Sequence, residues 1–147
     1  MSIAAVLRQK GAEIISVTPE TPLAEAVRLI ASRRIGAVVV VDRGGHVVGI
    51  LSERDVVRVV AERAAGIRGL AVEDLMTREV VMVGPDTPVE AAMEIMDEGY
   101  FRHLPVCTPD GRLLGIVSIR DLVKHRFSQQ QQDVESLQAY VTRTYMH

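Results

Sequence analysis

Short blocks of apolar residues alternate with polar stretches along the chain, and each block predicts one element. Residues 14–17 form a short run rich in β-branched side chains, and residues 37–41 are wholly apolar and too short for a helix, which predicts two strands. A helix is expected between them, because its apolar residues follow the i, i+3, i+4, i+7 spacing: Leu23, Ala26, Val27 and Ile30. Turn residues at 42–45 then predict a hairpin with a strand at 46–51, and a second helix is expected from Ser52.

The same order of elements returns 66 residues later without a gap. From Val17 to Arg58, 13 of 42 positions are identical to their counterparts, which indicates a duplication. Two copies are too few for a solenoid, so we expect two units packed face to face. The predicted fold class is α/β (α+β), with tandem β-α-β-β-α repeats at 1–66 and 67–127, related by a pseudo-twofold axis, and an amphipathic C-terminal helix at 128–147.

Composition and charge argue against several classes of protein. The 147 residues carry a formal net charge of −2, with 3% aromatic residues and no tryptophan, so no nucleic-acid partner is expected. No apolar run approaches the roughly 18–20 residues of a membrane span, and the N-terminus does not resemble a secretory signal. We therefore expect a cytoplasmic protein without a membrane partner. Cys107 is interpreted as a structural thiol, and the histidines show neither metal-ligand spacing nor a catalytic constellation, so we expect no metal and no enzyme.

One motif begins the second helix of both repeats and consists of a serine, an arginine and an aspartate. The two sets are Ser52, Arg54 and Asp55, and Ser118, Arg120 and Asp121. In structural terms, Ser-x-x-Asp is close to a capping box. In binding terms, the helix N-terminus, the hydroxyl and the guanidinium suit a phosphate, and the carboxylate suits the two hydroxyls of a ribose. Capping does not require a copied solvent-facing arginine, which favours a ribonucleotide site.

The strand at 37–41 and its counterpart in the second repeat begin with different residues. Arg102 and His103 enter an otherwise apolar strand, where a charge is costly unless it is paired. Their counterparts, Gly36 and Ala37, are small. Two interpretations remain open. The cationic pair lies outside the sheet in solvent, or it belongs to a site in which one copy offers cations and the other an apolar wall.

Together, the duplicated unit, the Gly-x-x-Ser-x-x-Asp segments and the Arg-His-Leu-Pro-Val segment resemble the cystathionine-β-synthase (CBS) domain pair over about residues 3–127. The resemblance is strongest to small stand-alone bacterial pairs, and it implies a disc, the Bateman module, with two clefts. Members of that family bind adenosyl ligands in these clefts, namely AMP, ADP, ATP, NAD or S-adenosylmethionine.

The resemblance also implies which residues form each cleft. One cleft would contain Ser118, Arg120 and Asp121, with Arg102 and His103 on the phosphate and the adenine near Ile14, Ile15, Ile35, Gly36 and Ala37. The other would contain Ser52, Arg54 and Asp55, with the base near Val80, Val81 and Phe101. Because the first copy lacks the cationic pair, we expect the cleft of Asp121 to bind more tightly.

The leading functional hypothesis is a non-enzymatic sensor that binds an adenine nucleotide and signals its occupancy to an unknown regulated protein. The alternative is a constitutive dimerisation scaffold with vestigial clefts. A nucleotide-hydrolysing enzyme is disfavoured, because metal ligands and a general base are missing. The tail carries an apolar stripe at helical spacing, which favours a homodimer over a helix folded back onto its own domain: Val134, Leu137, Val141 and Tyr145.

Overall fold

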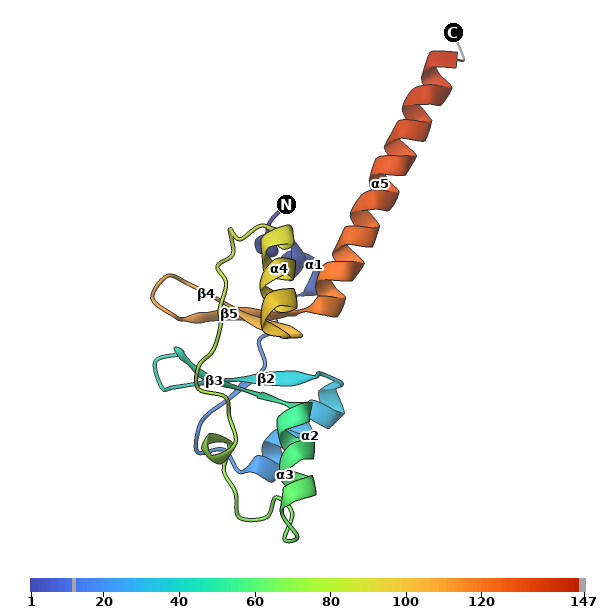
Figure 1. The fold of residues 1–147 in the computed structure, drawn as a ribbon. Helices are drawn as coiled ribbons and strands as arrows, with labels where there is room; N and C mark the ends of the chain where they lie inside the picture. Colours follow the sequence, from blue (N-terminus) through green and yellow to red (C-terminus); the bar gives the residue numbers. More distant parts are fainter. Residues whose placement is uncertain (12, 146–147) are drawn as a thin grey trace.

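The computed structural model describes residues 1–11 and 13–145 and places the two repeats as stacked units (Figure 1). The first unit contains a sheet in the order β1-β2-β3 and two helices: β1 (Ser16–Val17), β2 (Ala37–Val41), β3 (Val47–Ser52), α2 (Leu23–Arg33) and α3 (Glu53–Glu62). The second unit contains a hairpin and two helices: β4 (His103–Cys107), β5 (Leu113–Ser118), α4 (Val89–Gly99) and α5 (Ile119–Tyr145). Two further helices are α1 (Ile3–Lys10) and the 3-10 helix η1 (Val72–Asp74). The sheets face each other with helices on their outer sides, which confirms the predicted mixed fold of tandem repeats.

The hydrophobic pattern of the strands explains why the two sheets meet in the middle of the molecule. β2 is buried over its first four residues. Val38 belongs to the core of the first unit, and Val39, which points to the opposite face, is buried as well. β1 is shorter than the strand expected at 14–17, and its counterpart in the second unit is a single parallel bridge between Val83 and Val106.

The segment that precedes each repeat in the sequence packs on the opposite unit. α1 contributes Ile3 to the core of the second unit, and η1 contributes Val72 to the core of the first. The backbone pairing is repeated as well, since Ile3 N donates to Thr87 O and Val72 N donates to Thr21 O, both at 2.9 Å. The two repeats therefore exchange their leading segments, and α1, which the apolar pattern did not predict, completes the second core.

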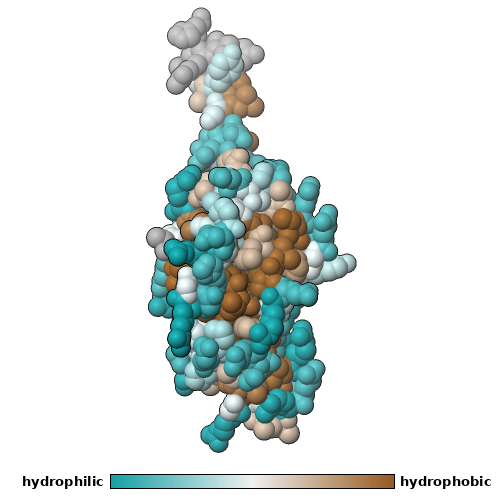
Figure 2. All heavy atoms as spheres, turned by 90° about the vertical axis from the view of Figure 1, so that its left-hand side faces the viewer, coloured by the Kyte–Doolittle hydropathy of each residue, from teal (hydrophilic) through white to brown (hydrophobic). Residues whose placement is uncertain are grey.

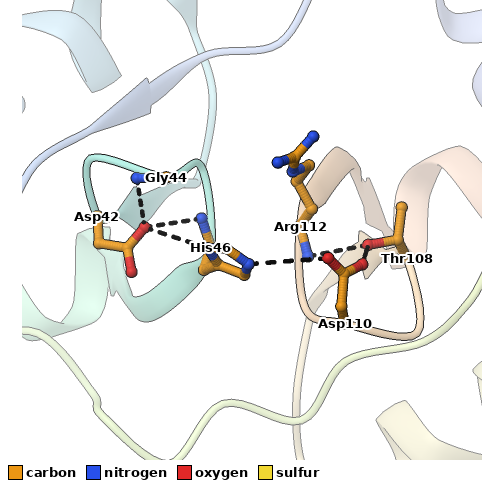
Figure 3. A network of polar contacts seen from close by, with 6 residues as sticks. All are labelled: Asp42, Gly44, His46, Thr108, Asp110 and Arg112. Atoms are coloured by element: carbon orange, nitrogen blue, oxygen red, sulfur yellow. Dashed lines mark hydrogen bonds and ion pairs between the residues drawn. The ribbon is translucent and has the colours of Figure 1, made fainter.

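The turns of the two hairpins are joined by a second reciprocal contact (Figure 3). Two backbone hydrogen bonds of 3.0 Å connect equivalent positions: Val47 N to Gly111 O, and Leu113 N to Gly45 O. The His46 side chain lies between carboxylates of the two turns, with Nδ1 3.5 Å from Asp42 and Nε2 3.8 Å from Asp110. The units are thus connected at their turns as well as through the exchanged segments.

α5 is one continuous helix, whereas the sequence analysis expected a repeat helix followed by a separate tail helix. Its first turns belong to the second unit, where Leu122 is fully buried, and the remainder projects away from the body (Figure 1). The polar run at 128–132 contains no glycine or proline, and glutamine is a good helix former, so the helix is not interrupted. Residues 146–147 of the predicted tail lie outside the described residues. Within the described part of the chain, no helix combines the length and the apolar character needed to cross a membrane.

Candidate functional site

A cavity of about 250 Å³ lies between the two units and is lined by residues from both repeats. The first repeat contributes the start of β2 and the junction of β3 with α3: Gly36, Ala37, Ile50, Ser52, Glu53, Arg54 and Asp55. The second repeat contributes the remaining residues: Thr77, Glu79, Val80, Val81, Tyr100, Phe101, Arg102, His103 and Pro105. Apolar side chains reach the surface at the level where the two units meet (Figure 2). Ten of the sixteen residues singled out in the sequence meet in this one cavity.

Ser52 and Asp55 are held in place by the N-terminal cap of α3. Asp55 N donates to Ser52 Oγ at 3.3 Å, and Asp55 Oδ2 accepts from Ser52 N at 2.9 Å and from the Ser52 hydroxyl at 3.0 Å. Ser118 and Asp121 form an equivalent cap at α5. In the described part of the chain, Asp55 Oδ1 has one ion-pair partner, Arg58 at 3.7 Å. Asp55 therefore keeps acceptor capacity for a ligand.

Two guanidinium groups line the same cavity. Arg54 lies in the first turn of α3 and Arg102 directly precedes β4. Neither side chain forms an ion pair with another described residue. Because charge-assisted hydrogen bonds to guanidinium groups are strong, this pair suits an anion such as a phosphate.

His103 lies where the starts of β2 and β4 approach each other. A Cβ at Gly36 would be 2.8 Å from His103 Cε1, so any other residue at Gly36 would collide with the imidazole. Burial lowers the pKa of His103, and the nearby Lys10 ammonium lowers it further. The imidazole is therefore neutral at pH 7, and the positive charge of the cavity comes from the two arginines.

The remaining surface of the cavity is largely apolar. Val81 and Phe101 are 40% and 39% exposed, and together with Val80 they offer a surface for a flat base. Tyr100 lies beside them, 89% exposed and with a φ of 57°, at the C-cap of α4. Six lining residues were not expected from the sequence: Ile50, Glu53, Thr77, Glu79, Tyr100 and Pro105. Ile50, Glu53 and Pro105 lie within the motif segments, but their spacing does not distinguish them there as ligand contacts.

Six of the expected residues do not line this cavity: Ile14, Ile15, Ile35, Ser118, Arg120 and Asp121. The first two line a separate hollow of about 680 Å³ between α1, β2 and β5, which is also lined by Lys10 and Ile116. Ile35 packs against the core of the first unit. Ser118 and Asp121 cap α5, and Arg120 is exposed.

The structure also changes how the predicted residues are grouped. Arg102 and His103, which the resemblance placed with Asp121, line the cavity of Asp55. The cause is the close approach of Gly36 to His103, which places the start of β4 beside the start of β2. The cavity of Asp55, whose own repeat lacks the Arg-His pair, therefore contains that pair from the other repeat. His103 also pairs with Ser118 between β4 and β5 and lies within electrostatic reach of Lys10 and Asp121.

The described part of the chain offers no group of three histidine, cysteine, aspartate or glutamate side chains that could hold a metal ion. Cys107 is buried, with Sγ 3.4 Å from Met82 Sδ. Burial raises the pKa of the Cys107 thiol, so the reactive thiolate is disfavoured. The cavity of Asp55 can bind a ligand through charge and hydrogen bonds.

Comparison with known proteins agrees with the fold and the duplication. Residues 10–62 and 72–128 match the CBS domain. An uncharacterized 17.7 kDa protein of Acidianus ambivalens is 40% identical over 112 residues, which cover 76% of this chain and 66% of the relative. The inosine-5'-monophosphate dehydrogenase of Methanocaldococcus jannaschii is 32% identical over 114 residues, which cover 78% of this chain and 22% of the enzyme. The chain thus spans about two thirds of the first relative and about a fifth of the second.

Solved structures share the same arrangement of units. A CBS-domain-containing protein from Agrobacterium tumefaciens is 41% identical, with a TM-score of 0.78 over 85% of this chain and 92% of that one. CBSX2, solved in complex with AMP, is 26% identical, with a TM-score of 0.76 over 88% of this chain and 98% of that one. With both repeats matched and the fold shared, the chain belongs to the CBS domain family.

Proposed function

We propose that this protein is a non-enzymatic regulatory module that binds an adenine nucleotide in the cavity of Asp55 and signals its occupancy to a partner protein. One observation carries the proposal. A single cavity is lined by two guanidinium groups without an ion-pair partner among the described residues, a carboxylate with acceptor capacity and an apolar surface. A phosphate, a ribose and a base need these three surfaces. The AMP complex of CBSX2 supports an adenosyl ligand, and AMP is the smallest nucleotide of the expected set.

Each part of the nucleotide has its own partners in this proposal. The phosphate binds Arg54 and Arg102, which lie on opposite repeats. The ribose hydroxyls donate to Asp55, whose position is fixed by the cap of α3. The base lies against Val80 and Phe101. The ligand therefore contacts both units at once.

Contact with both units supplies a means of signalling. A ligand that binds one packing arrangement of the units better than another shifts the population toward that arrangement. The hairpin turns and the exchanged segments also join the units, so a change in packing alters the outer surface of the molecule. A partner protein can recognise that altered surface. The regulated partner and the cytoplasmic location stay predictions from the sequence.

A ligand panel tests the proposed function. Thermal shift and calorimetric titration would compare AMP, ADP, ATP, NAD and S-adenosylmethionine, with GMP as the control for the base. A ligand at 100 times its dissociation constant adds about 2.7 kcal/mol to the free energy of unfolding. A flat response to the whole panel would favour the constitutive scaffold, and turnover of ATP or NAD would favour an enzyme.

Arg54→Ala should weaken AMP binding at least tenfold and leave adenosine binding nearly unchanged, because the substitution removes a phosphate partner only. A charge-assisted hydrogen bond contributes about 1.5–3 kcal/mol, which corresponds to that loss. Arg120→Ala is the matched control, since Arg120 holds the equivalent position in the second repeat and does not line the cavity. Isothermal titration with AMP and adenosine measures both. Equal losses for the two ligands would mean that Arg54 does not bind the phosphate.

We also propose that two copies associate through the projecting part of α5. Phe127, Val134 and Val141 recur every seven residues and are 68%, 54% and 43% exposed, and Leu137 between them is 63% exposed. Apolar residues at this spacing are typical of paired helices. A second copy that offers the same stripe would cover them. Tyr145, which the sequence analysis added to the stripe, ends α5, and its side chain lies outside the described part of the chain.

A chain that ends at Gln129 should be monomeric at micromolar concentration, whereas the full chain should be dimeric, because the truncation removes most of the stripe. Light scattering coupled to size-exclusion chromatography measures the mass. Leu137→Asp should have the same effect, and Ser136→Asp, an exposed position beside the stripe, is the matched control. If the truncated chain stays dimeric, Val57 and Val60, which are exposed on α3, form the interface instead. A monomeric full chain would refute the dimer.

A further inference from the structure

We infer that Lys10 closes the Asp121 motif to a ribose by occupying its carboxylate, so that each chain binds one nucleotide although it carries two copies of the Ser-x-Arg-Asp motif. The inference rests on the proposed function of the cavity at Asp55. It goes further by giving a reason why the two motifs bind nucleotide unequally, namely a side chain from the exchanged segment α1. It concerns the motif that the sequence alone ranked as the stronger site.

The ammonium group of Lys10 occupies the acceptors that a ribose would need. Nζ donates to Asp121 Oδ2 and to Ile116 O, both at 2.8 Å. The same Oδ2 accepts from Ser118 N at 2.8 Å. Burial alone would raise the pKa of the Asp121 carboxyl, but the hydrogen bonds from Lys10 and Ser118 lower it below its usual value. The ion pair is therefore fully formed at neutral pH.

Lys10 is presented by a helix that is anchored, rather than by a free end of the chain. It is the last residue of α1, whose Ile3 and Val6 are buried in the core of the second unit. Leu7 fits against Gly115, where a Cβ would lie 2.9 Å from Leu7 Cδ2. Packing over the length of α1 thus places the ammonium at the motif.

The corresponding segment of the other repeat leaves its motif open. Met76 fits against Gly49 as Leu7 fits against Gly115, but η1 has already ended at Asp74, before Met76. Ile50 O, the counterpart of Ile116 O, accepts from the backbone N–H of Thr77 at 2.9 Å instead of from an ammonium. Within the described residues, the side chain of Asp55 bonds only to the start of α3, and it lines the cavity.

The two copies of the motif therefore present different requirements to a ligand. Among the described residues, a nucleotide that enters at Asp55 meets only the 3.7 Å ion pair of Arg58 at the free oxygen of the carboxylate. A nucleotide that enters at Asp121 must first break both hydrogen bonds of Lys10, one of which is an ion pair. Binding at the second motif is disfavoured by that exchange, because any gain from ribose hydroxyls replaces contacts that the protein already makes.

Native mass spectrometry of the full chain, titrated with AMP, counts the nucleotides bound per chain. We expect one AMP per chain in the wild type and two in Lys10→Met, which keeps the length of the side chain and removes the charge. Arg8→Met is the matched control on α1 and should stay at one, since the exposed Arg8 makes no ion pair among the described residues. Lys10→Met combined with Asp121→Ala should return to one. Circular dichroism confirms that each variant is folded, and Lys10→Gln replaces Lys10→Met if the latter unfolds.

The outcomes separate this inference from the proposed function. Two AMP per chain in the wild type, or one in folded Lys10→Met and Lys10→Gln, would overturn the closure by Lys10 and leave the cavity of Asp55 as the nucleotide site. No AMP in the wild type but one in Lys10→Met, lost again with Asp121→Ala, would support the closure and overturn the assignment of the Asp55 cavity. No AMP in any variant would overturn both.

Discussion

Asp55→Ala is expected to weaken AMP binding by about ten- to a hundredfold, because two ribose hydroxyls lose their charged acceptor and each such hydrogen bond contributes about 1.5–3 kcal/mol. The sequence alone predicted a larger loss for Asp121→Ala. We propose the opposite order, because Arg102 and His103 line the cavity of Asp55 and the carboxylate of Asp121 is bonded to Lys10. Isothermal titration with AMP measures the loss.

Asp121→Ala is the matched control for that experiment. Both aspartates cap a helix, so each variant loses about 0.5–2 kcal/mol of stability whatever it binds. Titration at a temperature where circular dichroism shows both variants folded separates binding from stability. Asp121→Ala should bind AMP at the first motif as tightly as the wild type does. A larger loss in Asp121→Ala than in Asp55→Ala would contradict the site assignment.

The second large effect concerns the exchanged segment. Ile3→Ala should lower the free energy of unfolding by about 2–5 kcal/mol, the cost of removing most of a fully buried isoleucine side chain. A short N-terminal helix would ordinarily tolerate such a change. Here Ile3 belongs to the core of the second unit, although it lies at the other end of the sequence. Urea denaturation followed by circular dichroism measures the effect.

Arg8→Ala is the control for Ile3→Ala, because Arg8 is exposed on the same helix and a surface substitution changes stability by about 0.5 kcal/mol or less. The midpoint of unfolding should fall strongly for Ile3→Ala and barely for Arg8→Ala. If both variants unfold like the wild type, α1 does not contribute to the second core in solution.

The repeated pattern accounts for most of what the sequence could predict about the fold. The 66-residue offset, the stripe of α2 and the apolar run of β2 led to the correct order of elements in the first unit and, apart from a first strand reduced to a single bridge, in the second. Ser52 and Asp55 were correctly interpreted as a cap, because the capping box depends on residues only three apart. Contacts between residues this close in the sequence can be predicted from their spacing alone.

Features that depend on contacts between the repeats could not be predicted from the sequence in the same way. α1 shows only Ile3, Val6 and Leu7 as large apolar residues over two turns, and nothing in that pattern indicates which unit it covers. The location of Arg102 in the cavity of Asp55 follows from how closely Gly36 approaches His103, which is a property of the assembled units. The ion pair of Lys10 with Asp121 spans 111 positions of sequence and has no local signal.

A crystal structure of the full chain with AMP tests the central claim most directly, because it locates the nucleotide. The account predicts AMP in the cavity between the units, with its phosphate at Arg54 and Arg102, its ribose hydroxyls on Asp55, and Lys10 still bonded to Asp121. Nucleotide density at Asp121 with an empty cavity at Asp55, or no nucleotide at millimolar AMP, would contradict it.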